Sequence, residues 1–296
     1  MNIVIRTRLL TKTFRGRPAV RELNLTVPGS LVFGYLGPNG AGKTTTIRLL
    51  AGLLRPTSGR AEIGGHDVVR DREWAQRMIG YLPGDFVGYP DLTAASYLAY
   101  LGGLRGGVDP DRTRALADRL GLDLSRRIGA MSHGTRQKVG IVQAFMHRPE
   151  VLILDEPTAG LDPLVQREFL GMVRDAKRDG QTVFLSSHNL YEVEAVADLV
   201  AMLRHGTLAE VESVEKLKAQ AVRRMDLTFA AGPPADQLAM LAGIREVTVA
   251  GATAHLIVEG STEELFRVAA PFGIEQVVTH EPDLEDIFLS YYERGE

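Results

Sequence analysis

Apolar and polar positions along the first two thirds of the chain follow two different periods. Short, mostly apolar runs predict β-strands, and longer stretches with apolar residues every three or four positions predict α-helices. The predicted strands cover residues 4–10, 23–27, 31–36, 60–63, 79–82, 151–154, 182–185 and 199–204. The predicted helices cover residues 43–53, 94–104, 111–120, 133–146, 164–178 and 190–197. A β-rich start followed by βα alternation predicts a layered α/β core with an antiparallel edge.

Residues 94–147 interrupt the alternation, because nearly all of them carry the helical pattern. An all-helical stretch between two strands of a layered core is typical of an inserted subdomain. We therefore predict one domain over residues 1–220, with a helical subdomain at about 94–147.

A new pattern begins after residue 220. It predicts strands at 225–229, 245–249, 255–258 and 273–279, and helices at 235–241 and 262–269. Residues 221–296 are therefore expected to form a small α+β accessory domain. The final stretch, "DLEDIFLSYY", places Leu284, Ile287, Phe288 and Tyr291 on one helical face, which indicates a packing face or a partner-binding face.

Composition narrows the class of protein without identifying it. The 296 residues are 45% apolar and 24% charged, with a net charge of −3, so nothing in the charge favours a nucleic-acid partner. There are no cysteines, which excludes disulfides and thiolate metal sites. No apolar run approaches the roughly 18 residues of a membrane-spanning helix. The apolar run at the start of the sequence is too short to be the core of a signal peptide. We expect a soluble protein that would serve a membrane only through a partner.

A phosphate-binding loop is the first candidate site. The stretch "GPNGAGKTT" follows the predicted strand at 31–36 and opens the helix at 43, the context that G-x-x-x-x-G-K-[ST] requires. Glycines let successive N–H groups point inward, and the helix N-terminus adds unpaired donors. Lys43 would contact the β- and γ-phosphates, and Thr44 would bind Mg²⁺. The alternative is that this stretch is only a glycine-rich connecting loop. The loop consists of Gly37, Pro38, Asn39, Gly40, Ala41, Gly42, Lys43, Thr44 and Thr45.

A pair of carboxylates is the second candidate site. Asp155 and Glu156 end an apolar strand, at the edge where open α/β sheets bind ligands. We expect Asp155 to hold Mg²⁺ and Glu156 to accept a proton from an attacking water. Pro157 follows directly, which argues against a helix-capping role. His188 ends the next buried strand and could reach a γ-phosphate.

These motifs together resemble the ATP-binding subunit of ABC transporters over about residues 3–215. The diagnostic stretch is "MSHGTRQKVG", which is similar to the family signature Leu-Ser-Gly-Gly-Gln. Ser132 and Gly134 match that signature, whereas Met131, His133 and Thr135 depart from it. The resemblance implies a P-loop NTPase core of ABC type, with an antiparallel β-subdomain, an inserted helical subdomain and the small C-terminal domain.

The resemblance also implies roles for individual residues. Ser132 and Gly134 would bind the γ-phosphate held by a second subunit, and His188 would be the switch histidine. Phe14 would stack on adenine, unless it is a core aromatic. Asp162 would cross the dimer interface, and it also has the sequence position of a helix N-cap.

The implied function is ATP binding and hydrolysis that powers an ABC transporter. The C-terminal domain and its "LEDIFLSYY" ending are similar to those of ABC-2-type exporters, so we expect an exporter of drugs, antibiotics or other small hydrophobic molecules. An importer ATPase and a non-transport ABC-type ATPase are the alternatives. The expected partners are separate transmembrane permease subunits and a second, identical ATP-binding subunit, with no nucleic acid. The expected location is the cytoplasmic face of the plasma membrane.

One motif departs from the family pattern. The strand "IGYLP" is normally followed by a glutamine that approaches Mg²⁺ and the attacking water, but Gly84 stands at that position. Either Gly84 merely turns the chain, or Asp85 substitutes as an acceptor near Mg²⁺. A carboxylate has no N–H donor, so Asp85 could not copy every glutamine contact.

Overall fold

The computed structural model describes residues 2–220, 223–258 and 262–280. The chain separates into two compact units, Met1–Val214 and Glu215–Glu296. The division falls six residues before the boundary predicted from the sequence. The predicted helical face at 284–291 lies outside the described residues.

A six-stranded sheet forms the centre of the first unit, in the order β10-β9-β3-β8-β7-β6. Neighbouring strands are parallel except for the β9–β10 hairpin. Every residue of β3, β7 and β8 is buried, because helices cover both faces of a parallel sheet. The strands are β3 (Val32–Leu36), β6 (Ile79–Leu82), β7 (Val151–Asp155), β8 (Thr182–Ser187), β9 (Leu199–Arg204) and β10 (Thr207–Ser213).

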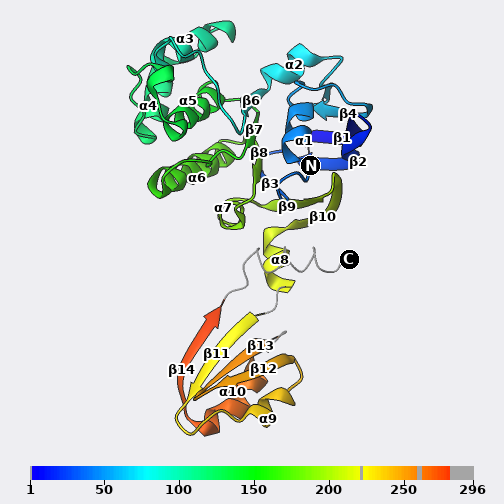
Figure 1. The fold of residues 1–296 in the computed structure, drawn as a ribbon, viewed down its shortest axis with the longest axis vertical. Helices are drawn as coiled ribbons and strands as arrows, with labels where there is room; N and C mark the ends of the chain where they lie inside the picture. The colour runs from blue at the N-terminus through cyan, green and yellow to red at the C-terminus, as the bar shows by residue number, and fades with distance from the viewer. Residues whose placement is uncertain (1, 221–222, 259–261, 281–296) are drawn as a thin grey trace. The chain divides into compact units, whose positions relative to one another are not determined.

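Helices flank this sheet. Figure 1 shows α1 (Lys43–Leu50) between the two sheets of the unit, in agreement with its contacts to β2, β4 and β7. The helix α6 (Pro163–Arg178) packs against β8. Its buried side chains recur at the helical period and form one apolar stripe: Phe169, Met172, Val173 and Ala176. The helices α2 (Arg72–Arg77) and α7 (Leu190–Glu194) also contact the sheet, at β6 and β8.

A second, antiparallel sheet has the order β2-β1-β4-β5. Its strands are β1 (Ile3–Phe14), β2 (Arg17–Pro28), β4 (Ser58–Ile63) and β5 (His66–Asp67). The β1–β2 hairpin pairs Phe14 with Arg17, and both connecting residues, Arg15 and Gly16, have positive φ. Two such residues form the two-residue turn whose twist matches the strands. The apolar pattern did not reveal this turn, so β1 and β2 are longer than the strands predicted at 4–10 and 23–27.

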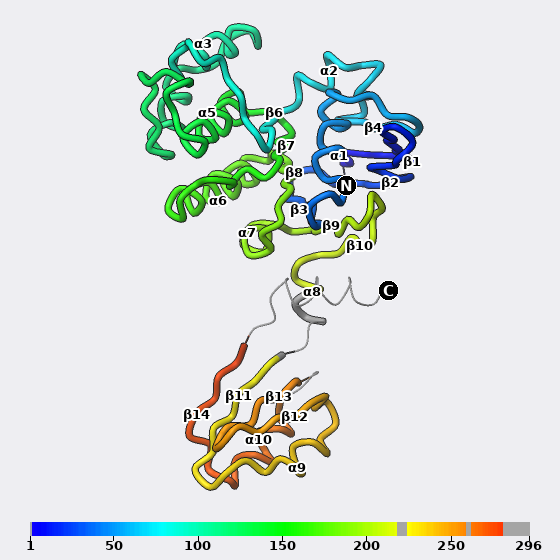
Figure 2. Tube along the Cα trace, in the orientation of Figure 1, coloured from blue at the N-terminus to red at the C-terminus, as the bar shows by residue number. Residues whose placement is uncertain are grey.

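The inserted segment contains the three predicted helices, α3 (Ala94–Leu104), α4 (Pro110–Arg119) and α5 (His133–Phe145). A short 3₁₀ turn, η1 (Ile128–Ala130), precedes α5. Figure 2 shows the chain leaving the sheet after β6 and returning to it at β7. The insertion therefore joins two neighbouring strands, β6 and β7, which pair in parallel.

The second unit has a four-stranded antiparallel sheet, in the order β12-β13-β11-β14. The helix α8 (Val214–Gln220) begins at the last residue of the first unit. The later elements are β11 (Arg223–Phe229), α9 (Ala235–Ala239), β12 (Ile244–Ala250), β13 (Thr253–Val258), α10 (Glu263–Ala269), η2 (Ala270–Phe272) and β14 (Ile274–His280). Its core contains Met225, Leu227 and Phe229 from β11, with Leu238 and Leu265 from the two helices. The α+β class predicted for this region is confirmed.

Several short or exposed elements of the first unit were not predicted from the sequence. The strand β10 alternates half-buried and exposed residues at the sheet edge. It was not predicted because its polar residues interrupt the apolar pattern of a strand. The helix α2 has only one buried residue, Ala75, so it lacks an apolar stripe. In contrast, the predicted helix at 43–53 ends earlier, at Leu50, and the chain turns at Gly52 with φ 68°.

Candidate active site

The phosphate loop lies between β3 and α1. Gly40 and Gly42 have φ of 81° and 107°, conformations that L side chains avoid. A Cβ on Gly42 would lie 2.4 Å from the Ala19 carbonyl oxygen, so both the backbone angle and the space require glycine. No side chain caps the N-terminus of α1, and its first turn contains no acidic residue. Its N–H donors therefore face the loop, as anion binding requires.

Lys43 is buried, with 6% of its side chain exposed. Its Nζ donates to the Gly37 carbonyl at 2.5 Å and to the Pro38 carbonyl at 3.4 Å. The same ammonium group lies 3.3 Å from Oε1 of Glu156. Lys43 thus joins the phosphate loop to the end of β7.

Asp155, the last residue of β7, is 1% exposed. Its Oδ1 accepts a hydrogen bond of 2.8 Å from the Ser186 hydroxyl. Burial raises the pKa of this carboxyl group, while hydrogen bonds from Ser186 and Thr44 oppose the rise.

Glu156 follows Asp155 in a strained conformation, with φ of 45°. Its backbone N–H donates to the Ser186 hydroxyl oxygen at 3.1 Å. Its carboxylate joins two groups: Oε1 faces Lys43, and Oε2 lies 2.7 Å from Nδ1 of His188. Left-handed conformations of non-glycine residues concentrate at functional sites, and here one occurs where the carboxylate contacts both Lys43 and His188.

A buried network that the sequence analysis missed holds the loops after β7 and β8 together. Glu192 of α7 is 8% exposed and accepts hydrogen bonds from Thr158 at 2.6 Å and Ser187 at 3.3 Å. The Asn189 amide donates to its other oxygen at 3.2 Å. Such a network positions Glu156 and His188 relative to each other. The one signal in the sequence was the polar pair Ser186–Ser187 at the end of an otherwise apolar strand.

The signature residues lie at the N-terminus of α5. Ser132 caps the helix, because its Oγ accepts from the Thr135 N–H at 3.2 Å. A Cβ on Gly134 would lie 2.2 Å from the Gly160 carbonyl oxygen, so the helix start packs tightly on the loop after β7. Asp162 caps α6 by accepting from the N–H groups of Leu164 and Val165, so the N-cap reading of this residue is confirmed.

Gly84 and Asp85 lie in different surroundings. A Cβ on Gly84 would be 3.4 Å from the Asp155 carbonyl oxygen and 3.5 Å from Oδ2, so Gly84 faces the expected magnesium ligand. The Asp85 side chain is 85% exposed, and its Oδ1 lies 4.0 Å from Nδ1 of His133. The contact of Asp85 with magnesium stays a prediction, and in this structure its carboxylate faces the signature helix.

Phe14 ends β1, with 46% of its surface exposed and the Lys12 ammonium 5.2 Å from the ring centroid. This exposure places the ring outside the core. Among the described residues, Phe14, Ser132, Gly134 and Asp162 make no hydrogen bond or ion pair with the cluster around Glu156. The structure therefore brings together Lys43, Thr44, Asp155, Glu156 and His188, and Lys43 joins Gly37 and Pro38 of the phosphate loop to them. It leaves Phe14, Ser132, Gly134 and Asp162 apart from this cluster.

Comparisons with known proteins match the motifs. A family model described as "ABC transporter" matches residues 20–159. The bacitracin transport ATP-binding protein BcrA of Bacillus licheniformis is 33% identical over 98% of this chain and 97% of that protein. The daunorubicin/doxorubicin resistance ATP-binding protein DrrA of Streptomyces peucetius is 38% identical over 72% of this chain and 66% of that protein.

A solved structure has the same fold. The ATP-binding subunit of an ABC transporter superposes with a TM-score of 0.68 and is 28% identical, over 73% of this chain and 92% of the other. With the loop, the carboxylate pair and the signature in place, the fold and activity expected from the sequence are confirmed. The chain belongs to the family of ABC transporter ATP-binding proteins, and it is an ATP-binding and ATP-hydrolysing subunit.

Proposed function

We propose that this chain powers the export of antibiotics, drugs or other small hydrophobic molecules through a separate membrane permease. The observation that carries the proposal is the alignment with the bacitracin transport protein, which extends over 98% of the chain and so includes the C-terminal unit. The relative named for daunorubicin and doxorubicin resistance supports the same substrate class. The fold alone would not support a substrate class, because one fold serves many functions.

In the proposed site the phosphate loop binds the nucleotide phosphates. The N–H groups of Gly40 to Thr45 and the start of α1 surround the phosphate chain, and Thr45 serves the α-phosphate side. Lys43 contacts the β- and γ-phosphates. Phosphate oxygens compete for its ammonium group, which now contacts two carbonyl oxygens and Glu156. Phosphate binding therefore loosens one of the two contacts that hold Glu156.

The residues present fit Mg²⁺. Asp155 and Thr44 offer a carboxylate and a hydroxyl, the oxygen ligands that this ion takes. Burial disfavours the charge on Asp155 and raises its pKa, and a divalent cation would offset that cost. We assign Asp155 and Thr44 to hold the ion, which would stabilise negative charge on the phosphates.

Glu156 acts on water in this proposal. Its carboxylate accepts the proton of a water molecule as the water oxygen bonds to the γ-phosphorus and the bond to the ADP oxygen breaks. The products are ADP and inorganic phosphate. His188 holds Glu156 through the 2.7 Å contact and faces the γ-phosphate.

The proposed working form is a pair of identical subunits. Ser132, Gly134 and the N-terminus of α5 bind the γ-phosphate held by the opposite subunit, while Asp162 crosses the interface and Phe14 stacks on adenine. Ser132 and Phe14 are exposed, so both are accessible to such contacts. Sedimentation of the Glu156→Gln variant tests the pairing: ATP should produce a dimer and ADP a monomer. A monomer with both nucleotides would contradict it.

The proposed membrane partner is a separate permease. Among the described residues, no helix combines the length and apolar character needed to cross a bilayer. In this proposal the chain lies at the cytoplasmic face of the plasma membrane, docked on the permease.

The export proposal is tested by deleting the gene for this chain and measuring drug susceptibility and efflux. Wild-type protein and the control Glu150→Gln, whose exposed side chain lies outside the site, should restore efflux. Glu156→Gln should not restore it. Unchanged efflux over a broad antibiotic panel after deletion, in cells that express the protein, would count against export.

A further inference from the structure

Two residues that lie where this chain departs from the family pattern face each other in the structure. Asp85 follows Gly84, which stands where a glutamine is expected, and His133 stands where the family signature has a glycine. The Oδ1 of Asp85 lies 4.0 Å from the Nδ1 of His133. Because one residue is in the loop after β6 and the other begins α5, only the fold brings them together.

The backbone on both sides of Asp85 is anchored. On one side, a Cβ on Gly84 would lie 3.4 Å from the carbonyl oxygen of Asp155, the expected magnesium ligand. On the other side, Phe86 is 3% exposed and packs on α5, because a Cβ on Gly140 would lie 2.8 Å from its ring. The loop therefore holds Asp85 between the end of β7 and α5, although the carboxylate itself is 85% exposed.

The imidazole of His133 also contacts the loop after β7. A Cβ on Gly160 would lie 2.6 Å from the Cδ2 of His133, so the imidazole packs directly on the backbone of this loop. The same loop begins with Glu156. His133 therefore lies between Asp85 on the loop after β6 and the loop that carries Glu156.

Taken in order, these contacts lead away from β7 and back to it. The loop after β6 packs on the end of β7, and Asp85 within it faces His133. The imidazole of His133 packs on Gly160, in the loop that follows β7. The contact between Asp85 and His133 joins two exposed side chains, whereas the other contacts involve backbone. Substitution can therefore remove this one contact without disturbing the core.

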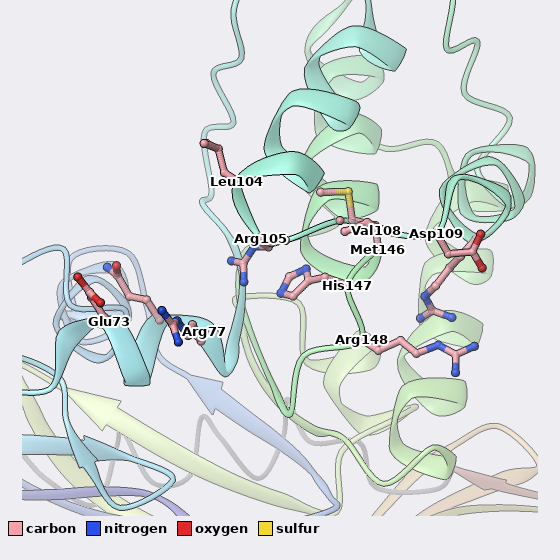
Figure 3. Close-up of a pocket in the computed structure, with 13 residues that line it drawn as sticks. Glu73, Arg77, Leu104, Arg105, Val108, Asp109, Met146, His147 and Arg148 are labelled. Atoms are coloured by element: carbon pink, nitrogen blue, oxygen red, sulfur yellow. The ribbon is translucent and has the colours of Figure 1, made fainter.

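A separate link joins the insertion to the other end of β6. The guanidinium group of Arg105 donates to the Ile79 carbonyl at 3.1 Å, and the Nε2 of His147 lies 3.2 Å from the same oxygen. Figure 3 shows these two side chains near each other, where the insertion meets the sheet. Asp85 and His133 provide a second link at the end of β6 that lies near the carboxylates of the active site.

A carboxylate and an imidazole attract each other in two ways. The imidazole donates a hydrogen bond when its Nδ1 carries the proton, and it adds a positive charge when both nitrogens are protonated. The observed distance is roughly 1 Å longer than a hydrogen bond, a gap that rotation of two exposed side chains can close. We propose that Asp85 and His133 pair during ATP hydrolysis, as positioning residues that tie the start of α5 to the loops beside Asp155 and Glu156.

The test is steady-state ATP hydrolysis by the full chain, with Asp85→Ala, His133→Ala and the double variant. Each single variant should lower kcat about threefold to fivefold, the effect expected from loss of an exposed ion pair. The KM for ATP should change by less than about twofold, because neither side chain binds the nucleotide in this proposal. The double variant should lose no more than either single variant, since all three remove the same contact.

Conservative variants and a matched control separate positioning from a general loss of structure. His133→Lys and Asp85→Glu keep the charges of the pair, so their kcat should stay within about twofold of wild type. Asp91→Ala removes another exposed carboxylate from the same loop and should leave kcat unchanged. All variants should unfold close to the wild-type midpoint, because the substituted side chains are exposed.

Four results would overturn the proposal. Additive losses in the double variant would show that the two residues act separately, and wild-type kcat in both single variants would show an incidental surface contact. An equal loss in Asp91→Ala would show a general effect of charge. A changed Mg²⁺ dependence for Asp85→Ala alone would assign Asp85 to the metal. Because the readout is ATP hydrolysis, none of these outcomes depends on whether the chain serves export.

Discussion

The Nδ1 of His188 lies 2.7 Å from Oε2 of Glu156, and the His188 backbone N–H donates to the same oxygen at 3.3 Å. Because Oε1 faces the buried ammonium of Lys43, the carboxylate is held at both oxygens. The three residues come from the ends of different strands or from the start of α1. The position of Glu156 therefore depends on three segments of the chain at once.

Glu156→Gln should lower kcat for ATP hydrolysis by a factor of about 10² to 10⁴, the usual contribution of a general base. The amide keeps the shape of the side chain but accepts no proton, so ATP binding should persist. Steady-state hydrolysis and equilibrium ATP binding measure the two effects, with Glu150→Gln as the control. A kcat close to that of wild type would exclude Glu156 as the base.

Asp155→Asn should abolish Mg²⁺-dependent hydrolysis and also stabilise the fold in Mg²⁺-free buffer. The amide removes a buried charge, and its Oδ1 keeps the acceptor for the Ser186 hydroxyl. The folded-state pKa of Asp155 is raised, so wild-type protein loses stability as the pH rises through that pKa. The variant has no carboxyl group at this position and should not show this loss. Thermal unfolding at several pH values measures the difference. A variant less stable than wild type throughout would contradict the prediction.

Gly134→Ala should lower the free energy of unfolding much more than Gly84→Ala. A Cβ at position 134 meets the Gly160 carbonyl oxygen at 2.2 Å, a clash with backbone that we expect to cost about 1–3 kcal/mol. This exceeds the helix propensity gained, about 0.5–1 kcal/mol. At position 84 the nearest atom is 3.4 Å away, so stability should change by less than about 0.5 kcal/mol. Chemical denaturation measures both, and equal losses would refute the packing argument.

His147 should make the fold sensitive to acid. Its pKa falls from 6.5 to about 4 through burial and the charge of Arg105, so between these values the unfolded chain binds more protons than the folded chain. Stability is complete above pH 6.5 and falls as the pH approaches 4. Allowing for partial exposure, we expect a loss of about 1 kcal/mol at about pH 5.

Denaturation of wild type and His147→Gln at several pH values measures this loss. The variant should lose less stability on acidification, whereas the exposed control His205→Asn should follow wild type. Parallel curves for wild type and His147→Gln would show that another group controls the acid response.

Most elements that present the site could be predicted from the sequence. The buried runs of β3, β7 and β8, the loop before α1 and the acidic pair after β7 are local patterns, in which neighbouring residues set the conformation. Gly40 and Gly42 are examples of such local control, because the backbone angles of the loop require glycine at these two positions. The exposed strand β10 and the short helix α2 could not be predicted, because neither buries a regular apolar face.

Only the tertiary structure decided which side chains meet. The order β3-β8-β7 brings Lys43, Glu156 and His188 together, and the packing of α5 on the loop after β7 places Gly134 against Gly160. The physical reason is that the local pattern fixes the conformation of each segment, whereas contacts between segments depend on which strands pair and which helices cover them.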